Sequence, residues 1–570
     1  MKQMRIFLLL TIVFVFATET QAQPSQQSKY RVTFTNKYNT SYTLSNPSAY
    51  LSPRAIQRRV NQGIAIDSTD IPVNQNYIDG VLAINGTLMT RSKWFNTITV
   101  AISDTTLLSS IRALPYVSSV FRLYPAGGKK APKSKRPAFN TQSLENEFDP
   151  YVYNMLAAGY NEESFSIKSF NYGAGFSQAT MIGIDYLHAL GYSGQGMIIA
   201  VLDAGFYNVN TLTVFDSLRN AGKILGTKDF VDPGADVYTK STHGMAVMSI
   251  MGGNLPGQLV GTAPHASYWL LRTEDAASEF MIEEDNWIAA AEFADSVGAD
   301  VINSSLGYTE FYDPSQNYTY ADMNGVTARV TQGADMTFSK GILVVNSAGN
   351  SGNTPWRYVG APADGINVLS IGAVDENAQI ASFSSHGPSF DGRVKPNVSA
   401  QGQNTAVVTG SGNITTGNGT SFSSPVVAGA VACLWQANPT LTNIQLKSFI
   451  EQSAHLYPLW DTLYGYGIPN FAAAHVLIAN HVKPEDPFIL VYPNPFDDEI
   501  FMIFQSEAPQ TVNIEIIDNN GRKLAIQKDI QLDLGYNNIS IDRLKGKSKG
   551  LYFLRIITEK QVYVKQIMKL

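Results

Sequence analysis

The sequence predicts an α/β protein: a doubly wound parallel sheet, preceded by a small α+β domain and followed by a C-terminal β-sandwich. Two observations indicate the central sheet. Short, continuous apolar runs at residues 197–202, 300–303 and 342–345 are typical of strands buried on both faces of a parallel sheet. Helical patterns alternate with them, for example at residues 286–297. In such folds the ligand site lies beyond the carboxyl ends of the strands.

The bulk composition is that of a soluble globular protein with more than one domain. The chain has 570 residues, of which 44% are hydrophobic and 15% charged. A net charge of -6 gives no reason to expect nucleic acid as a partner. With Cys433 as its single cysteine, the chain can form no internal disulfide.

The N-terminus has the pattern of a signal peptide. Lys2 and Arg5 precede an apolar core at residues 6–17, and small residues end at Ala22, where a signal peptidase would cut. An uncleaved membrane anchor is the alternative, but the core is shorter than the ~20 residues that a span needs. We therefore predict a signal peptide at residues 1–22 and no transmembrane segment in the mature chain. Export without disulfides favours a protein that is secreted or held at a bacterial cell surface.

Residues 28–124 are predicted to form the small α+β domain, which has a normal domain size. Its expected elements are a strand at 30–34, a helix opened by Ser52 and Pro53, a strand at 97–102, a helix capped by Asp104 and a strand at 117–123. Residues 125–170 follow as a linker with two glycines and a run of basic residues. We interpret them as an exposed maturation region, although a charge run is usually only solvated.

The last predicted unit, residues 488–570, reads as β structure. Residues 512–516 alternate between apolar and polar side chains, and residues 551–557 give another strand. The turn signal at residues 518–521 is typical of a hairpin. A β-sandwich is the expected fold.

Candidate catalytic groups stand at the expected strand and helix ends. Asp203 directly follows a buried strand, and His243 stands where a helical pattern begins. Asn350 lies in a small polar turn after a third strand. Ser421 precedes an apolar run at 426–435, which suits a buried helix, so its hydroxyl would lie near the helix N-terminus. Taken alone, Ser421 could equally be only a helix cap.

Together these side chains are the set that serine hydrolysis needs. The reaction uses a nucleophile, a base, a carboxylate that orients the base, and donors for the oxyanion. Their order in the chain, Asp203, His243 and then Ser421, distinguishes between folds. An α/β-hydrolase has the order Ser, Asp, His, and the chymotrypsin type has the order His, Asp, Ser.

Five ordered segments within residues 171–478 resemble the subtilisin-like (subtilase) serine peptidase family. They lie at residues 199–206, 241–253, 301–307, 348–350 and 419–432. The resemblance implies a subtilisin-like fold in which Ser421 is the nucleophile, His243 the general acid/base and Asp203 its orienting partner. Asn350 matches the residue whose side chain donates a hydrogen bond to the oxyanion, and the backbone N–H of Ser421 would be the second donor. The implied substrate-binding segments are Ser305, Leu306 and Gly307, and Ser347, Ala348 and Gly349.

Three positions depart from the pattern of that family. Ala204 stands where a hydroxyl residue is usual, Met245 and Ala246 replace a Thr-His pair, and Val426 replaces a histidine. None of these changes removes a group that handles a proton or the oxyanion. They leave the rate and the pH optimum open.

The flanking domains carry resemblances of their own. Residues 28–124 resemble the inhibitory propeptide of such enzymes, mainly in the order of their predicted elements and in the short motif at residues 114–120. Residues 492–496, 550–552 and 565–570 resemble the C-terminal sorting domain of type IX secretion cargo. An accessory β-sandwich that binds substrate or stabilises the enzyme is the alternative for the latter.

The sequence thus predicts a secreted serine endopeptidase made as a zymogen, acting through an acyl-enzyme intermediate. Expected partners are protein or peptide substrates, its own propeptide and the type IX secretion machinery. We assign no cofactor and no metal, since no Asp-rich loop of recognisable spacing appears. A degenerate protease kept as a peptide-binding module is a rival from another class, and a narrow maturase of exported proteins is a second rival.

Overall fold

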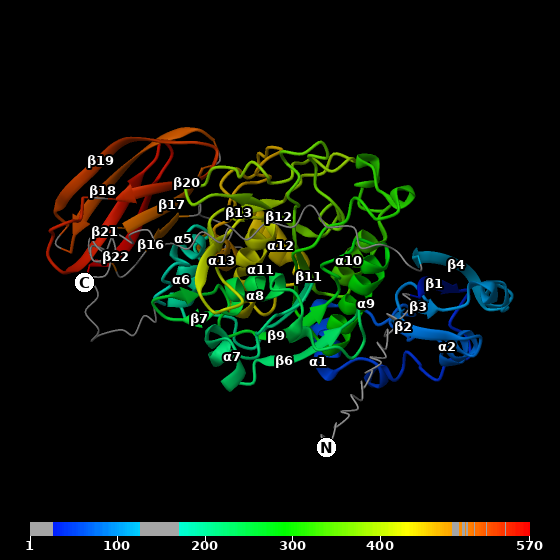
Figure 1. Ribbon diagram of the computed structural model, residues 1–570. Helices are drawn as coiled ribbons and strands as arrows, with labels where there is room; N and C mark the ends of the chain where they lie inside the picture. Colours follow the sequence, from blue (N-terminus) through cyan, green and yellow to red (C-terminus); the bar gives the residue numbers. More distant parts are fainter. Residues whose placement is uncertain are drawn as a thin grey trace, which may run out of the picture.

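The computed structural model describes residues 27–125, 170–480 and 489–569, the last range with short gaps at 493–495, 497–499, 507, 520 and 542. Figure 1 shows three parts in chain order: a small N-terminal domain, a large central domain and a C-terminal domain made of strands. The predicted signal peptide, most of the predicted linker and part of the 492–496 motif lie outside the described residues.

The central domain is built on a seven-stranded sheet in the order β13-β12-β11-β10-β5-β9-β6, and every pairing in it is parallel. This confirms the doubly wound α/β prediction. The strands are β5 Ile198–Asp203, β6 Ile224–Asp229, β9 Ser267–Arg272, β10 Val301–Ser304, β11 Leu343–Ser347, β12 Leu369–Val374 and β13 Val398–Gln401.

Helices cover both faces of this sheet because alternate strand residues point to opposite sides. In β5, Ile199 and Val201 share one core with α8 His243–Gly252 and α11 Thr420–Ala437. Ala200 and Leu202 share the opposite core with α9 Ile282–Val297 and α10 Arg329–Ser339. The remaining elements of the domain are α5 Phe176–Thr180, α6 Ile184–Ala189, α7 Asp216–Asn220, α12 Asn443–Gln452, α13 Phe471–Asn480, and the paired short strands β7 Asn254–Leu255 with β8 Leu259–Val260 and β14 Thr405–Val408 with β15 Ile414–Gly417.

Two helices begin earlier than predicted, and both for the same reason. The first turn of α9 holds Glu283, Glu284 and Asp285, and α11 starts with small polar residues from Thr420. The common reason is that neither stretch shows the apolar periodicity by which a helix is recognised in a sequence. The acidic residues of α9 are nevertheless favourable in a first helical turn, because the helix dipole stabilises negative charge there. The N-cap of α11 is Gly419, so Ser421 lies inside the helix and is not its cap.

The N-terminal domain is an antiparallel four-stranded sheet in the order β2-β3-β1-β4. The predicted strands and helices are present, but α2 and the mostly polar strand β2 were missed. The elements are β1 Ser28–Phe34, α1 Pro53–Gln62, α2 Gln75–Leu82, β2 Gly86–Ser92, β3 Thr97–Ile102, α3 Leu108–Arg112 and β4 Val117–Tyr124. Ser52 caps α1 as predicted, its Oγ accepting the Ala55 N–H at 3.2 Å.

The C-terminal domain is a β-sandwich, as predicted. Two antiparallel sheets, in the orders β16-β17-β20 and β19-β18-β21-β22, share one core that includes Phe504 from the first and Ile514 from the second. The strands are β16 Ile489–Tyr492, β17 Ile500–Ser506, β18 Gln510–Asp518, β19 Lys523–Leu532, β20 Gly535–Ile541, β21 Gly550–Ile557 and β22 Val562–Lys569.

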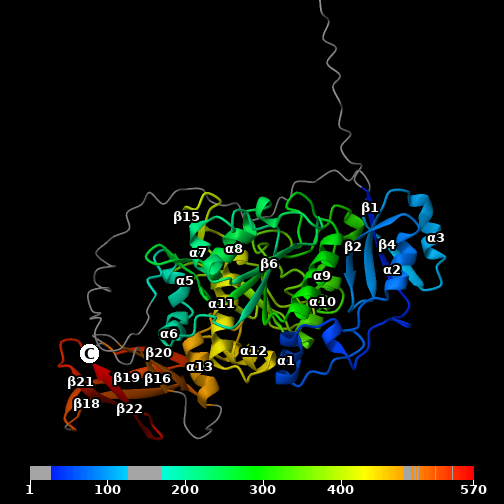
Figure 2. The same cartoon turned by 90° about the horizontal axis from the view of Figure 1, so that it is seen from below.

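The sheet of the N-terminal domain packs against α9, and its strand β2 lies beside that helix (Figure 2). Helix α9 carries buried carboxylates toward this domain. Asp285 pairs with Arg31, whose Nε donates to Oδ1 at 2.9 Å. Glu292 accepts the backbone N–H groups of Lys93 at 2.7 Å and Trp94 at 3.1 Å. The interface is therefore held by charge-assisted hydrogen bonds, which are stronger than neutral ones.

A second contact lies at the opposite end of α9, where α1 docks near α12 (Figure 2). Asp295 is fully buried and binds three cations of the N-terminal domain: Arg58 at 2.5 Å, Arg59 at 2.7 Å and Lys93 at 2.9 Å. Burial alone would raise the pKa of Asp295, but the three positive charges outweigh it and hold this pKa well below its usual range.

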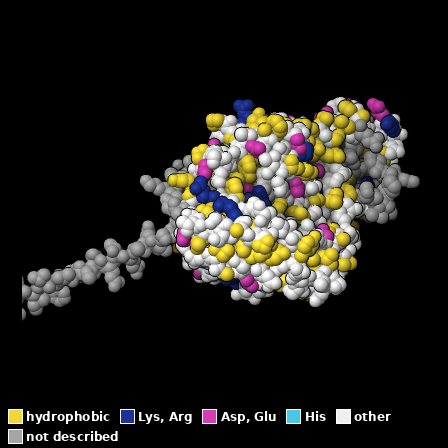
Figure 3. All heavy atoms as spheres, turned by 90° about the vertical axis from the view of Figure 1, so that its right-hand side faces the viewer, with side chains coloured by type: hydrophobic (Ala, Val, Ile, Leu, Met, Phe, Trp, Pro, Cys, Tyr) yellow, Lys and Arg dark blue, Asp and Glu magenta, His cyan; other side chains and the backbone are white. Residues whose placement is uncertain are grey.

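The outer face of the N-terminal domain is seen in Figure 3, where charged side chains of both signs are scattered among hydrophobic and neutral ones. This side of the molecule therefore presents mixed charge rather than one basic surface. In the described part of the chain, none of the helices combines the length and the apolarity that a membrane span needs.

Candidate active site

Four segments bring the predicted catalytic side chains to one edge of the central sheet. Asp203 is the last residue of β5, His243 the first of α8 and Ser421 the second of α11, while Asn350 follows the end of β11. Because β5, β10 and β11 are parallel neighbours, their carboxyl ends lie at the same edge. The site is assembled where the fold class predicts it.

Asp203 and His243 form a hydrogen-bonded pair. The Nδ1 of His243 lies 2.8 Å from Oδ1 and 3.0 Å from Oδ2 of Asp203, and both residues are buried. A carboxylate at this nitrogen fixes the proton on Nδ1 and leaves Nε2 as the basic atom. Gly244 permits the close approach, since a Cβ at this position would lie 2.8 Å from the Cβ of Asp203.

Ser421 is positioned by a proline four residues further along its helix. Pro425 lacks the N–H that would bond to the carbonyl of Ser421 in a regular α-helix. The hydroxyl of Ser305 donates to that carbonyl instead, at 2.9 Å. In return, the Oγ of Ser421 donates to the carbonyl of Ser305 at 3.3 Å.

In this resting arrangement, no hydrogen bond joins Ser421 Oγ to His243 among the described residues. The Phe422 ring, next to Ser421, lies 6.1 Å from the His243 ring, centroid to centroid. Rotation about the Cα–Cβ bond of Ser421 would redirect its hydroxyl from the Ser305 carbonyl. Catalytic hydrogen bonds are often long before substrate binds and tighten afterwards.

Two buried residues that the sequence interpretation did not single out support Ser305. Asn303 donates through Nδ2 to Ser305 Oγ at 3.3 Å, and its Oδ1 accepts from the hydroxyl of Ser424 at 2.9 Å. The network joins the end of β10 to the first turns of α11. An asparagine inside an apolar strand run gave no signal for this role, since its partners come from distant parts of the chain.

Asn350 is tied to the start of α11 by its side-chain oxygen. Its Oδ1 accepts the N–H of Thr420 at 2.8 Å and the Thr420 hydroxyl at 2.9 Å. The oxygen is thus committed to Thr420, while Nδ2 makes no hydrogen bond within the described residues and is left as the donor of the amide. The hydroxyl of Thr420 also accepts the N–H of Gly349 at 3.1 Å. Thr420 was missed as a positioning residue because its partners lie in a loop distant in sequence.

The two predicted substrate-binding segments differ in what they offer. Gly307 is exposed, and its N–H and C=O bond to no group in the described residues, so an extended chain could pair with them. Ser305 and Leu306 precede it and are buried. In the other segment, Ser347 and Ala348 are also buried. Gly349 donates to Thr420, and its carbonyl accepts the N–H of Ser385 at 3.0 Å. The second segment can line a cleft but has few free groups for strand pairing.

At the positions that depart from the family pattern, the residue either donates a backbone hydrogen bond to Asp203 or is buried in the core. The N–H of Ala204 donates to Asp203 Oδ1 at 2.6 Å. Met245, Ala246 and Val426 are fully buried in the core shared by α8 and α11. The departures therefore fill apolar space and leave the Asp203–His243 pair intact.

Within the described residues, one cluster of three glutamate side chains has the geometry to hold a cation. Ligand oxygens of Glu274, Glu279 and Glu283 lie within 4.8 Å of one another. They follow β9 and enter the first turn of α9, and no motif in the sequence indicated that they would meet.

The chain is similar to known proteins in all three of its parts. Residues 194–467 match the Subtilase family, residues 29–137 match the Peptidase S8 propeptide domain of Bacteroidota, and residues 490–570 match the Secretion system C-terminal sorting domain. The last match favours the sorting interpretation of the β-sandwich over an accessory role.

Individual known proteins are similar to about half of the chain. Subtilisin E of Bacillus subtilis (strain 168) is 33% identical over 292 residues, which are 50% of this chain and 68% of that protein. Subtilisin DY of Bacillus licheniformis is 31% identical over 298 residues, covering 52% of this chain and 96% of that protein. The crystal structure of MycP1 from Mycobacterium smegmatis is 22% identical, has a TM-score of 0.43, and is matched over 56% of this chain and 87% of its own.

Proposed function

Because the chain belongs to the subtilase family of serine peptidases, we propose that it hydrolyses internal peptide bonds of proteins through an Asp203–His243–Ser421 triad. The observation that carries this proposal is the convergence of four separate segments on one sheet edge. There the Asp203 carboxylate binds His243 Nδ1 at 2.8 Å, and in the first turn of α11 Ser421 directly follows Thr420, whose N–H donates to Asn350 Oδ1 at 2.8 Å.

In the proposed acylation, Ser421 Oγ attacks the scissile carbonyl while Nε2 of His243 takes the hydroxyl proton. The carbonyl oxygen becomes an oxyanion, which would accept hydrogen bonds from Nδ2 of Asn350 and the N–H of Ser421. His243 then gives its proton to the leaving amine nitrogen as the C–N bond breaks. Asp203 stays ionised and stabilises the imidazolium that forms in between.

Deacylation repeats these steps with water. His243 takes a proton from a water molecule, whose oxygen attacks the ester carbonyl of the acyl-enzyme, and the same two donors hold the second oxyanion. Return of the proton to Ser421 Oγ releases the carboxylic acid product. Subtilisin-type chemistry of this kind uses no cofactor.

Labelling with a serine-directed fluorophosphonate probe would distinguish an active enzyme from a degenerate peptide-binding module. A fluorophosphonate probe should label the mature protein at Ser421, and a denatured protein substrate should yield internal fragments. A mature, folded protein that takes no label and cuts no substrate would point to the binding module. The cleavage profile then distinguishes a broad protease from a narrow maturase.

The N-terminal domain is a subtilase propeptide by its match, and we propose that it inhibits the enzyme until it is cut. Its last strand, β4, ends beside the catalytic domain, where the Tyr124 ring packs 4.1 Å from the Phe280 ring, centroid to centroid. The cut would fall in the predicted maturation region, residues 125–170. The sorting domain indicates a protein that is secreted or held at the cell surface, with the type IX machinery as a partner.

Docking of the propeptide should depend strongly on Asp295. In an uncut Ser421→Ala zymogen, Asp295→Asn would leave Arg58 and Lys93 buried without their anion, while Arg59 would keep only its pair with Asp70. Breaking a buried pair costs about 3–5 kcal/mol. We expect a clearly lower unfolding temperature by calorimetry. The pKa of Asp295 is depressed in the folded state, so its contribution is present above pH ~3.8 and is lost as the pH falls through the folded-state pKa.

Asp313→Asn is the matched control for this experiment. Asp313 pairs with Arg122 of the propeptide at 3.7 Å, but both side chains are substantially exposed. Surface pairs of this kind contribute at most about 1 kcal/mol. Equal effects of the two substitutions would contradict the role of the buried Asp295 cluster.

Loss of the Asn350 donor should reduce kcat and leave KM nearly unchanged, because the oxyanion exists only along the reaction path. We expect Asn350→Leu to lower kcat about 10²- to 10³-fold, the magnitude known for the corresponding donor of subtilisin. Steady-state kinetics on a chromogenic peptide would measure it. Asn353→Leu, at an exposed position in the same loop, should stay close to wild type. A rise in KM alone would instead assign Asn350 to substrate binding.

A further inference from the structure

The three glutamates Glu274, Glu279 and Glu283 lie where the propeptide meets the catalytic domain. Glu274 and Glu283 are almost fully buried, and Glu279 is half-buried. Two hydrogen bonds orient them. The hydroxyl of Tyr308 donates to Glu274, and the N–H of Asp275 donates to Glu283 Oε1 at 3.0 Å. The group is thus a fixed feature of the fold; we call it the glutamate cluster.

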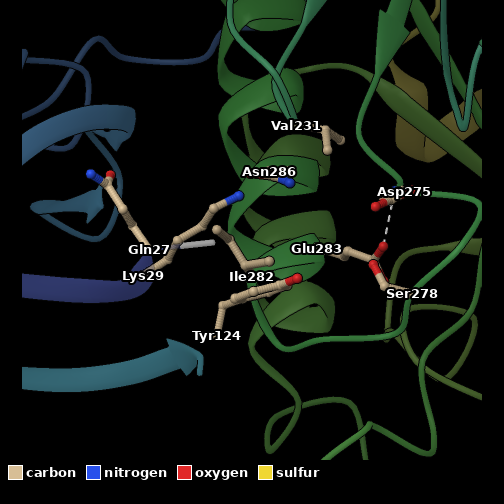
Figure 4. Close-up of a pocket in the computed structure, with 9 residues that line it drawn as sticks. All are labelled: Gln27, Lys29, Tyr124, Val231, Asp275, Ser278, Ile282, Glu283 and Asn286. Atoms are coloured by element: carbon tan, nitrogen blue, oxygen red, sulfur yellow. Dashed lines mark hydrogen bonds between the residues drawn. The ribbon is translucent and has the colours of Figure 1, made fainter. Parts of the chain in front are cut away.

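A cavity of about 100 Å³ adjoins this cluster (Figure 4). The propeptide contributes Gln27, Lys29 and Tyr124 to its walls, and the catalytic domain contributes Val231, Asp275, Ser278, Ile282, Glu283 and Asn286. Carboxylate and amide acceptors therefore line the catalytic side, and the amino group of Lys29 extends toward it from the propeptide.

Asn286 independently indicates a binding site, because its side-chain oxygen is buried without a hydrogen-bond donor among the described residues. Its side chain is 1% exposed, and Nδ2 donates to the carbonyl of Thr273 at 3.3 Å. Its Oδ1, however, is buried and has no partner among the described residues. A buried acceptor without a donor is costly, so this wall of the cavity is suited to a ligand that brings N–H groups.

The cluster adjoins the part of the cleft that an extended substrate would enter. Tyr308, which binds Glu274, directly follows Gly307 with its free backbone groups. The carbonyl of Glu279 accepts the N–H of Tyr312 at 2.8 Å, which ties the cluster to the same loop. Tyr124, at the end of the propeptide, packs on Phe280 near the cluster. Substrate residues N-terminal to the scissile bond would enter the cleft from the same direction as the propeptide.

We propose that the glutamate cluster, with Asn286, becomes a subsite for a lysine or arginine side chain of the substrate, N-terminal to the scissile bond. This inference rests on the proposed function, since the cavity opens only when the propeptide leaves. In the zymogen, Lys29 of the propeptide reaches into the same cavity. The predicted maturation region carries the same chemistry, because Lys129 and Lys130 follow shortly after Pro125.

An organic cation suits this group better than a metal ion does. Glu274 and Glu283 each accept one hydrogen bond, from Tyr308 and Asp275, and their remaining lone pairs can accept further N–H donors. A guanidinium offers five N–H donors to carboxylates and to an amide oxygen such as that of Asn286. Hydrogen bonds to charged groups favour the bound cation enough for a preference of about 10- to 100-fold.

The test uses mature enzyme purified from the secreted full chain and pairs of quenched peptides. Each pair differs only in arginine against citrulline, its uncharged isostere, at one of the positions upstream of the cut. We expect at least a tenfold higher kcat/KM for arginine at one position, mainly through KM. In Glu279→Gln and Glu283→Gln that ratio should fall toward one. Asp216→Asn, a surface carboxylate on α7, should keep the wild-type ratio.

The outcomes separate this inference from the proposed function. If wild type cleaves neither peptide of any pair, the proposed function fails. If it cleaves both members of every pair equally well, the subsite is wrong. A melting temperature that Ca²⁺ raises in wild type but not in Glu279→Gln, without any arginine preference, would assign the cluster to a metal and overturn the subsite. Since Glu279 is half-buried, its variant remains informative if Glu283→Gln does not fold.

Discussion

Replacement of Ser421 by alanine is expected to reduce turnover by about 10⁶-fold, the magnitude known for the nucleophile of the related subtilisin. The physical reason is that the acyl-enzyme cannot form without the hydroxyl. His243 and Asn350 remain, but a base and an oxyanion donor without a nucleophile leave only a small residual rate. Assays on a peptide substrate with purified mature protein would measure the loss.

The same substitution should block maturation. Wild-type protein is expected to lose the signal peptide, the propeptide and the sorting domain, while Ser421→Ala keeps its propeptide. Intact mass and N-terminal sequencing of the two secreted products would show this. Ser411→Ala, at an exposed position before the same motif, should mature as wild type does.

Two results would count against these roles. Full activity of Ser421→Ala on a peptide would show that another residue is the nucleophile. Identical maturation of both proteins would show that a different protease removes the propeptide, and the triad would then depend on the activity assay alone.

The sequence was sufficient for the architecture because its signals are local. The apolar runs that became β5, β10 and β11 needed only their own residues to be recognised as buried strands. Once a parallel sheet is assumed, Asp203 must stand at its carboxyl edge. The chain order of Asp203, His243 and Ser421 then selected one fold among serine hydrolases.

Features that depend on tertiary contacts could not be predicted in this way. Thr420 binds Asn350, and Asn303 binds Ser424, only because loops far apart in the chain meet. The glutamate cluster likewise joins the loop after β9 to the start of α9. Side-chain partners across such distances leave no periodic pattern, so a single sequence does not disclose them.

The start of α11 was mispredicted because of a proline inside the helix. A proline usually ends or kinks a helix, and Pro425 follows a stretch in which all residues but Phe422 are small and polar, so the predicted helix began at residue 426. In the structure the freed carbonyl of Ser421 is bound by Ser305 Oγ at 2.9 Å. Pro425, which made the helix hard to predict, is therefore the residue that allows Ser305, directly after β10, to position the nucleophile.

Asp203→Asn should be the second most damaging substitution, with kcat lowered about 10⁴-fold and KM little changed. An asparagine can present its amide N–H to Nδ1 of His243, which moves the imidazole proton to Nε2. That tautomer has no lone pair for the proton of Ser421. The defect is one of protonation, not of shape, so fluorophosphonate labelling should slow by a similar factor while the melting temperature changes little.

Asp229→Asn provides the contrasting case. Asp229 also ends a strand of the same sheet and is buried, but it pairs with Arg272 at 2.8 Å and does not contact His243. Its substitution should lower the melting temperature by leaving Arg272 unpaired, with a far smaller loss of kcat. If Asp203→Asn behaved like Asp229→Asn, Asp203 would be a structural ion of the sheet edge, and orientation of His243 would require another group.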